Sequence, residues 1–207
     1  MDKLIEVLII VGYISIAIEL IFFHVPSVSS TVNLLKPEKS LTDLYSEEYR
    51  KLFYLPVWIK VIVFVIPVIL IYFTFLYPFL HLFTDLFSQQ LFTPSIITIV
   101  LSLLMIITGR VITILSVLRI RKQNKQKQDS FKLHTGLLFS KMRNPIQVGM
   151  YFFVIGIWLY VPSVTFLTGI LMYIGYMHFK IFMEEDFLEN KYGAAYKNYQ
   201  SLTRRYI

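Results

Sequence analysis

The sequence contains no cysteine and has few charged residues. Without cysteine the chain cannot form disulfides, thiolate metal sites or a cysteine nucleophile, and it cannot be prenylated or palmitoylated on cysteine. Charged residues make up only 16% of the sequence, whereas 56% is hydrophobic and the mean hydropathy is +0.63. This composition is too apolar for an ordinary soluble domain. We therefore expect an all-α, polytopic membrane bundle whose apolar surface faces lipid.

Two further kinds of binding are disfavoured by the pattern of residues. The four histidines, at positions 24, 81, 134 and 178, never occur at a spacing that would place metal ligands on one helix face, so no metal is expected. The net charge of +7 could indicate nucleic acid, but the basic residues flank the hydrophobic segments. There they set the orientation of the chain and meet anionic lipid, so no nucleic-acid partner is expected.

Long apolar runs predict about five transmembrane helices, because roughly 20 apolar residues cross a bilayer as a helix. Between Asn144 and Phe179 no side chain is formally charged, and the sequence Tyr160-Val161-Pro162-Ser163 divides this run in two. The last two spans are therefore predicted to form a tight helical hairpin. The first three runs cover residues 4–23, 55–77 and 94–118, and a short interfacial helix is expected around 41–53.

Two prolines and a lysine shape the expected second span. Pro67, in its middle, should kink the helix, which membrane proteins tolerate when neighbours satisfy the freed carbonyl. Pro78 is expected to begin the turn that follows. Lys60 lies one turn inside the span and is expected to extend its ammonium group toward the interface.

The distribution of basic residues predicts the orientation in the membrane. Residues 61–109 contain no lysine or arginine, whereas residues 119–143 contain eight basic residues against Asp129. Cytoplasmic loops carry such an excess. We expect the N-terminus outside, the C-terminus inside, and a basic loop at 119–132 that binds anionic lipid headgroups. The compact plan, rich in Ile, Phe and Lys, favours a prokaryotic plasma membrane.

The dipeptide Asn144-Pro145 is a start signal for the fourth span, because Asn is favoured at the N-cap and Pro at the first helical position. The N–H groups and positive dipole end of this helix, with Arg143 beside them, would suit a carboxylate or phosphate. An ordinary cap with a snorkelling arginine explains the same residues.

Three consecutive carboxylates, Glu184, Glu185 and Asp186, stand where the last span leaves the membrane. A helix can turn only one or two of them toward the bundle, and a solvated helix end is the simpler explanation. His178, seven residues before Glu185, could share its face and provide a polar contact near a pocket, or could be an interfacial histidine.

Tyrosines follow the carboxylates at helical spacing. Tyr192, Tyr196 and Tyr199 are separated by 4 and 3 residues, so on a continuous helix they share one face. Packing against the bundle is the simpler role, but Tyr196 and Tyr199 could also offer rings to a cation. Gly193 is expected to break the helix or to allow a close backbone approach.

The order of these motifs resembles the isoprenylcysteine carboxyl methyltransferase and phospholipid methyltransferase family. The resemblance extends from Gly109 to the end, so we divide the chain into a transmembrane scaffold (1–108) and a methyltransferase-like region (109–207). The residues that carry it are Leu133-x-Thr135-Gly136, Arg143-Asn144-Pro145-Ile146-x-x-Gly149, Glu184-Glu185-x-x-Leu188-x-x-x-Tyr192-Gly193-x-x-Tyr196-x-x-Tyr199 and Arg205.

The resemblance implies a membrane enzyme that binds S-adenosylmethionine at the cytoplasmic face and methylates a membrane lipid or a lipidated substrate. The acceptor would be an isoprenylcysteine carboxylate or another amphiphile. Together with the residues above, it predicts catalytic roles for Glu184, Glu185 and Arg205. The predicted cofactor-binding residues are Gly136, Arg143, Asn144, Pro145, Gly149, His178, Glu184, Tyr196 and Tyr199.

The predicted chemistry needs few special residues. Methyl transfer from a sulfonium is an in-line displacement, which alignment and electrostatic pre-organisation can accelerate. An amine acceptor must lose a proton, and Glu184 or Glu185 is the candidate base; a carboxylate acceptor needs none. Two alternatives stay open, an NADPH-dependent sterol-type reductase, although such proteins are usually longer, and a small transporter or scaffold, although no inverted repeat is found.

Overall fold

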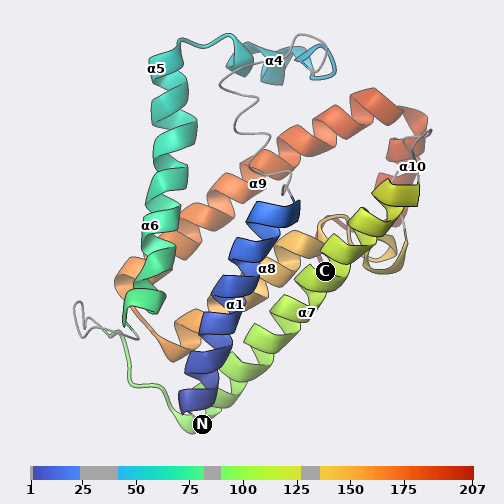
Figure 1. Cartoon of the computed structure of the whole chain (residues 1–207). Coiled ribbons are helices and arrows are strands. Elements are labelled where there is room, and N and C mark those ends of the chain that lie inside the picture. The colour runs from blue at the N-terminus through green and yellow to red at the C-terminus, as the bar shows by residue number, and fades with distance from the viewer. Residues whose placement is uncertain (1, 24–41, 82–89, 127–135) are drawn as a thin grey trace.

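A computed structural model describes residues 2–23, 42–81, 90–126 and 136–207, most of which form helices (Figure 1). Within these ranges no strand is formed beyond two isolated bridges. The helices are α1 (Asp2–Phe23), α4 (Glu47–Phe53), α5 (Val57–Lys60), the π-helical η1 (Val61–Val65), α6 (Ile66–His81), α7 (Ile96–Gln126), the 3₁₀-helical η2 (Leu137–Ser140), α8 (Pro145–Tyr160), α9 (Val164–Tyr192) and α10 (Ala194–Leu202).

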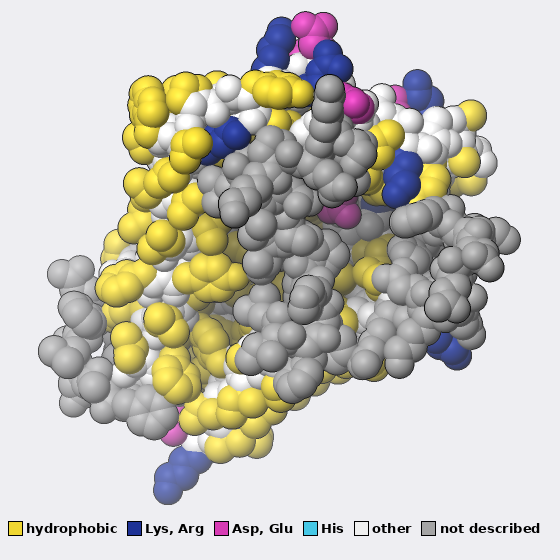
Figure 2. Space-filling view, turned by 45° about the horizontal axis from the view of Figure 1, so that its top comes forward, with side chains coloured by type: hydrophobic (Ala, Val, Ile, Leu, Met, Phe, Trp, Pro, Cys, Tyr) yellow, Lys and Arg dark blue, Asp and Glu magenta, His cyan; other side chains and the backbone are white. Residues whose placement is uncertain are grey.

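Three helical stretches are long and apolar enough to cross a membrane, namely Val57–Leu80, Ile96–Ile120 and Val164–Tyr192. The apolar helix α8 is shorter, with 16 residues, and α1 has 22. In Figure 2 hydrophobic side chains cover the flanks of the described helices, and charged side chains gather at the end that carries α4. The prediction of an all-α membrane protein is confirmed at this level, and the count of five spans stays a prediction.

The second predicted span accommodates its prolines without ending. A π-helical turn, η1, directly precedes α6, whose second residue is Pro67, a residue that has no N–H for the helical ladder. Pro78, which we expected to begin a turn, lies inside α6. Lys60 is buried instead of reaching outward, and its Nζ donates a hydrogen bond to the carbonyl of Phe53 at 2.5 Å. This bond ties the start of the span to the C-terminal end of α4.

The helices α7 and α8 approach each other most closely, through small residues. A Cβ atom added at Gly109 would lie 2.5 Å from the backbone nitrogen of Phe153, and one at Gly149 would lie 2.4 Å from Oγ1 of Thr113. The hydroxyl of Ser102 donates to a carbonyl of α8 at 2.7 Å. Such small-residue surfaces let membrane helices pack backbone to backbone.

The connection between α8 and α9 is short, as predicted, and Ser163 caps α9 by accepting a hydrogen bond from the Phe166 amide at 3.4 Å. The two helices stay in contact beyond this turn, since Gln147 Nε2 of α8 donates a hydrogen bond to the Tyr173 hydroxyl of α9 at 2.8 Å, but each packs more extensively against another helix. The small residues explain why: those of α8 face α7, while Gly169 of α9 faces Thr74 of α6.

The basic segment after the third span is also different from the prediction. Helix α7 continues to Gln126, so residues 119–126 form its last turns rather than a loop, and 127–132 lie outside the described residues. Arginine, lysine and glutamine are good helix formers, and cations are favourable near a helix C-terminus.

Helix α4 packs against the polar end of α9. An aromatic and aliphatic cluster joins Phe53 of α4, Phe64 of η1 and Met183 of α9. The Ser46 amide donates to the Asp186 carboxylate at 2.8 Å, and the rings of Tyr45 and Phe187 lie 5.2 Å apart. The predicted interfacial helix around 41–53 is therefore present as the shorter α4, and it holds α9 in place.

Candidate functional site

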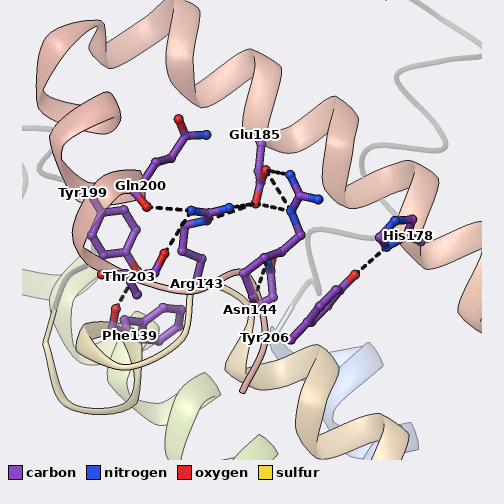
Figure 3. Close-up of polar contacts among 10 residues, drawn as sticks. Phe139, Arg143, Asn144, His178, Glu185, Tyr199, Gln200, Thr203 and Tyr206 are labelled. Carbon is purple, nitrogen blue, oxygen red and sulfur yellow. Dashed lines mark hydrogen bonds and ion pairs between the residues drawn. The ribbon is translucent and has the colours of Figure 1, made fainter.

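Three charged side chains from separate segments meet at one end of the bundle (Figure 3). Arg143 precedes α8, Glu185 lies on α9, and Arg205 lies after α10; we call these three the ion cluster. Glu185 accepts hydrogen bonds from Arg143 Nε at 3.1 Å and from Arg205 Nη2 at 2.7 Å. Its side chain is only 8% exposed. One buried carboxylate thus balances two guanidinium groups, which leaves a net charge of +1.

Arg143 also fastens the C-terminal segment to the bundle. Its Nη1 donates to the carbonyls of Gln200 at 3.1 Å and Thr203 at 3.0 Å (Figure 3). Its backbone amide donates to the carbonyl of Arg204 at 2.8 Å. Hydrogen bonds to a charged donor are stronger than neutral ones, so this single side chain orders the chain that carries Arg205.

The start of α8 differs in one respect from the prediction. The helix begins at Pro145, as expected, but the Asn144 side chain makes no cap bond. Its Nδ2 instead donates to the carbonyl of Arg205 at 3.2 Å. The Arg143 guanidinium is held by Glu185 and by two carbonyls, and an anion pocket at this helix end stays a prediction.

The three carboxylates point in different directions, as a helix requires. Glu185 faces the bundle, Glu184 is exposed, and Asp186 binds the Ser46 amide. The hydrogen bonds that Arg205 donates to Glu185 raise the pKa of its guanidinium, which keeps the cation charged. In this arrangement Glu185 acts as the counter-ion that holds both arginines.

The tyrosines are divided between two helices. Gly193 has a φ of 54° and ends α9 at Tyr192, as predicted, so Tyr192 does not continue the face of Tyr196 and Tyr199. Both tyrosines of α10 are buried, and the Tyr199 hydroxyl donates to the Phe139 carbonyl at 2.6 Å (Figure 3). Burial raises the pKa of Tyr199 to about 12, so the hydroxyl remains a donor. These rings pack α10 onto η2 and offer no open face to a cation.

An aromatic patch that the sequence reasoning missed lies beside Arg205. The guanidinium carbon of Arg205 lies 4.2 Å from the ring centre of Phe182. His178 contacts the Tyr206 hydroxyl through Nδ1 at 2.8 Å, and their rings stack (Figure 3). The ring of Tyr151 on α8 lies 6.2 Å from that of Tyr206. Helical spacing could have revealed Phe182, because it stands one turn before Glu185.

Comparison with protein families shows which family this part of the chain matches. Residues 97–195 match the family model of phospholipid methyltransferases. This part of the chain belongs to the phospholipid methyltransferase family. Its members belong with the isoprenylcysteine-type membrane methyltransferases and use S-adenosylmethionine. The protein is therefore a multi-pass membrane methyltransferase, and the reductase and transporter alternatives lose their support. No curated protein and no solved structure shows a significant match to the chain.

The family match covers most, but not all, of the methyltransferase's ion cluster. It begins within α7 and ends within α10, so it includes Arg143 and Glu185. Arg205 lies beyond its end, and the predicted region of 109–207 extends further toward the C-terminus. The boundary between the two predicted regions stays a prediction.

Other predicted cofactor residues of the methyltransferase lie away from the ion cluster. A Cβ atom on Gly136 would lie 2.9 Å from Nη2 of Arg119, at the end of α7. Gly149 lies in the contact between α7 and α8, where it has a packing role. Pro145 is buried at the start of α8, where it follows Asn144, and Glu184 lies on another face of α9. The structure thus gathers Arg143, Asn144, Glu185 and Arg205, with His178 adjacent, and the cofactor contacts of all these residues stay predictions.

Proposed function

We propose that this methyltransferase binds S-adenosylmethionine beside the ion cluster and transfers its methyl group to a lipid-borne acceptor. One observation carries the location of the cofactor. In the described part of the chain, Arg205 uses Nε and Nη2 for Glu185 while its Nη1 has no partner. Its side chain is 30% exposed, compared with 11% for Arg143. A cationic, accessible guanidinium fits the carboxylate of the cofactor.

The proposed roles follow from these positions. Arg205 is assigned to the cofactor carboxylate, and Arg143, Glu185 and Asn144 are positioning residues that fix Arg205. The ring of Tyr206 is proposed to offer a face for the sulfonium cation, in place of the buried Tyr196 and Tyr199, because the Phe182 ring already contacts the Arg205 guanidinium. When bound, the cofactor supplies an electrophilic methyl group on a sulfonium. The residues then have to align the acceptor and exclude water, because the displacement needs no covalent help from the protein.

The acceptor decides whether a base is needed. A carboxylate acceptor, such as that of an isoprenylcysteine, needs none. An amine acceptor must lose a proton, but Glu185 is occupied by two guanidinium groups and Glu184 faces elsewhere. In the aromatic patch His178, rather than either glutamate, is then the candidate base, since it lies beside Tyr206 and near Arg205.

We further propose that the ion cluster lies at the cytoplasmic face and the N-terminus outside, in a prokaryotic plasma membrane. Five crossings by α1, the α5–α6 stretch, α7, α8 and α9 would give this arrangement. Basic residues at the end of α7 and before α8 support it, because positive charge is retained inside. The same residues are available for anionic headgroups.

Calorimetric titration of the purified protein with S-adenosylmethionine tests the proposed site. Wild type should bind, and Arg205→Gln should weaken binding at least about tenfold, a loss of ~1.4 kcal/mol. Arg204→Gln is the matched control, since that neighbouring arginine is exposed. A folded wild type that releases no heat would overturn the proposed function. Transfer of a labelled methyl group into a lipid extract then identifies the acceptor.

A further inference from the structure

Four polar side chains form a series that runs from the interior of the bundle to its surface beside the ion cluster. They are Gln147 and Tyr151 of α8, Tyr206 after α10 and His178 of α9, and we call them the polar array. Gln147 is buried, Tyr151 and Tyr206 are half-buried, and His178 is exposed. Polar groups inside an apolar bundle cost desolvation energy unless they bind one another or a ligand.

Each member of the polar array interacts with the next. The Tyr206 hydroxyl lies 2.8 Å from Nδ1 of His178 (Figure 3), and the Tyr206 ring lies 6.2 Å from the ring of Tyr151. The Tyr151 hydroxyl is excluded from solvent and interacts with Gln147 and Tyr206, although it forms no hydrogen bond of normal geometry with either. Tyr151 therefore links the buried amide of α8 to the C-terminal segment.

The Gln147 amide gives the polar array a direction. An amide nitrogen carries two protons and only donates. One proton goes to the Tyr173 hydroxyl at 2.8 Å, and the other faces the Tyr151 oxygen. A hydroxyl that accepts from one side offers its single proton to the other, so Tyr151 donates to Tyr206 and Tyr206 donates to Nδ1 of His178. This direction fixes the imidazole with its proton on Nε2 and makes Nδ1 the basic atom.

The surroundings of His178 suit a proton that passes through rather than one that is stored. Burial raises the pKa of Tyr206, so its hydroxyl keeps a proton at neutral pH and can release it only as it receives another. The Phe182 ring lies 4.7 Å from the imidazole and 4.2 Å from the guanidinium carbon of Arg205. A cation this near disfavours a lasting imidazolium. The exposed imidazole then passes its proton on to water.

We propose that the methyl acceptor loses its proton through the Tyr206 hydroxyl. The proton of the acceptor goes to the Tyr206 oxygen while the Tyr206 proton goes to Nδ1 of His178, and Nε2 then releases a proton to water. The electron pair left on the acceptor forms the bond to the methyl group as the bond from carbon to sulfur breaks. Tyr206 is the catalytic residue of this step, and Gln147 and Tyr151 are positioning residues. This inference rests on the proposed function, because it assigns a proton path to the same site.

Removal of the Tyr206 hydroxyl tests the proton path. Tyr206→Phe keeps the ring, so calorimetric binding of S-adenosylmethionine should stay close to that of wild type. In contrast, kcat for transfer of a labelled methyl group to a lipid extract should fall at least about 100-fold. His178→Gln, whose amide oxygen still accepts the hydrogen bond, should lower kcat by a similar factor. Tyr54→Phe is the matched control, because it removes an exposed hydroxyl and should behave as wild type.

A double variant separates this role from a structural one. Residues that act in one relay have non-additive effects, so Tyr206→Phe combined with His178→Gln should be no slower than either single variant. Additive losses in the double variant, or a loss of cofactor binding that matches the loss of kcat, would overturn the inference. An unchanged kcat in Tyr206→Phe would overturn it too and would leave the proposed function standing.

Nitrogen-15 NMR of histidine-labelled protein in detergent tests the direction of the polar array without any acceptor. In wild type with neutral histidines, the His178 signals, assigned by their absence from His178→Gln, should show a proton on Nε2 and a hydrogen-bonded Nδ1. Tyr206→Phe should shift the Nδ1 signal to that of a nitrogen without a hydrogen bond, and Tyr54→Phe should not. A proton on Nδ1 in wild type would overturn the inference, whereas a folded wild type that binds no S-adenosylmethionine would overturn the proposed function.

Discussion

Glu185→Gln should destabilise the protein strongly, because one carboxylate holds both arginines of the ion cluster. Glutamine has nearly the shape of glutamate, so the substitution removes charge without leaving a cavity. Arg143, whose side chain is 11% exposed, would lose its counter-ion, while its hydrogen bonds to Gln200 and Thr203 would remain. The effect therefore isolates the charge interaction.

The size of the effect follows from burial. Removing one partner of a buried ion pair costs about 3–5 kcal/mol. Because Arg205 is 30% exposed and water can partly solvate it, we expect the lower end, ~3 kcal/mol. For a chain of this size 1 kcal/mol corresponds to about 2–4 °C, so the midpoint of thermal unfolding should fall by about 6–12 °C.

Thermal unfolding in detergent measures this prediction, with Glu48→Gln as the control. Glu48 lies on α4 and is exposed, so its substitution should change stability by less than about 0.5 kcal/mol. In a double-mutant cycle with Arg143→Gln, the two substitutions should couple by about 0.5–3 kcal/mol. Equal shifts for the two glutamate variants, or an additive cycle, would refute the assignment of Glu185 as the counter-ion.

Two further predictions concern packing and orientation. Gly109→Ala should destabilise the α7–α8 contact by about 1–3 kcal/mol or more, because its Cβ would lie 2.5 Å from a backbone atom. Gly175→Ala should not lower the stability, because its Cβ would meet nothing within 4 Å. Thermal unfolding of both variants checks this, and equal midpoints for the two would contradict it. Because the chain has no cysteine, the single variants Ser95→Cys and Ser201→Cys report the orientation of the chain directly. In intact cells a membrane-impermeant thiol reagent should label Ser95→Cys and should not label Ser201→Cys. Labelling of both variants, or of Ser201→Cys alone, would exclude the proposed topology.

The composition of the sequence was enough to predict a helical membrane protein, and local motifs predicted the start of α8 at Pro145 and the end of α9 at Gly193. Prediction from sequence fails where a residue is compatible with two local structures. Pro78 resembles a turn signal but lies within α6, and the basic residues from 119 onward resemble a loop but prolong α7. In both places local propensity leaves two structures open, and the surrounding helices decide between them.

Pairing of the helices was harder to predict than their existence. The short connection at Val161–Ser163 indicates a hairpin, but the glycines of α8 match α7 and Gly169 of α9 matches α6. Hydropathy does not predict the steric fit between helices that are far apart in the sequence. For the same reason the sequence indicated Arg143, Glu185 and Arg205 singly, but not that one carboxylate would bind both cations.

Helix α9 connects the N-terminal region to the ion cluster through two adjoining faces. One face, with Glu185 and Phe182, carries the ion cluster and the aromatic patch, and the other, with Phe179, packs against Phe64 of η1 and Tyr49 of α4. Both of these elements lie outside the family match. A rotation of about 100° per residue separates neighbouring positions on a helix. The residues that face Phe179 can therefore change without altering the contacts of Glu185.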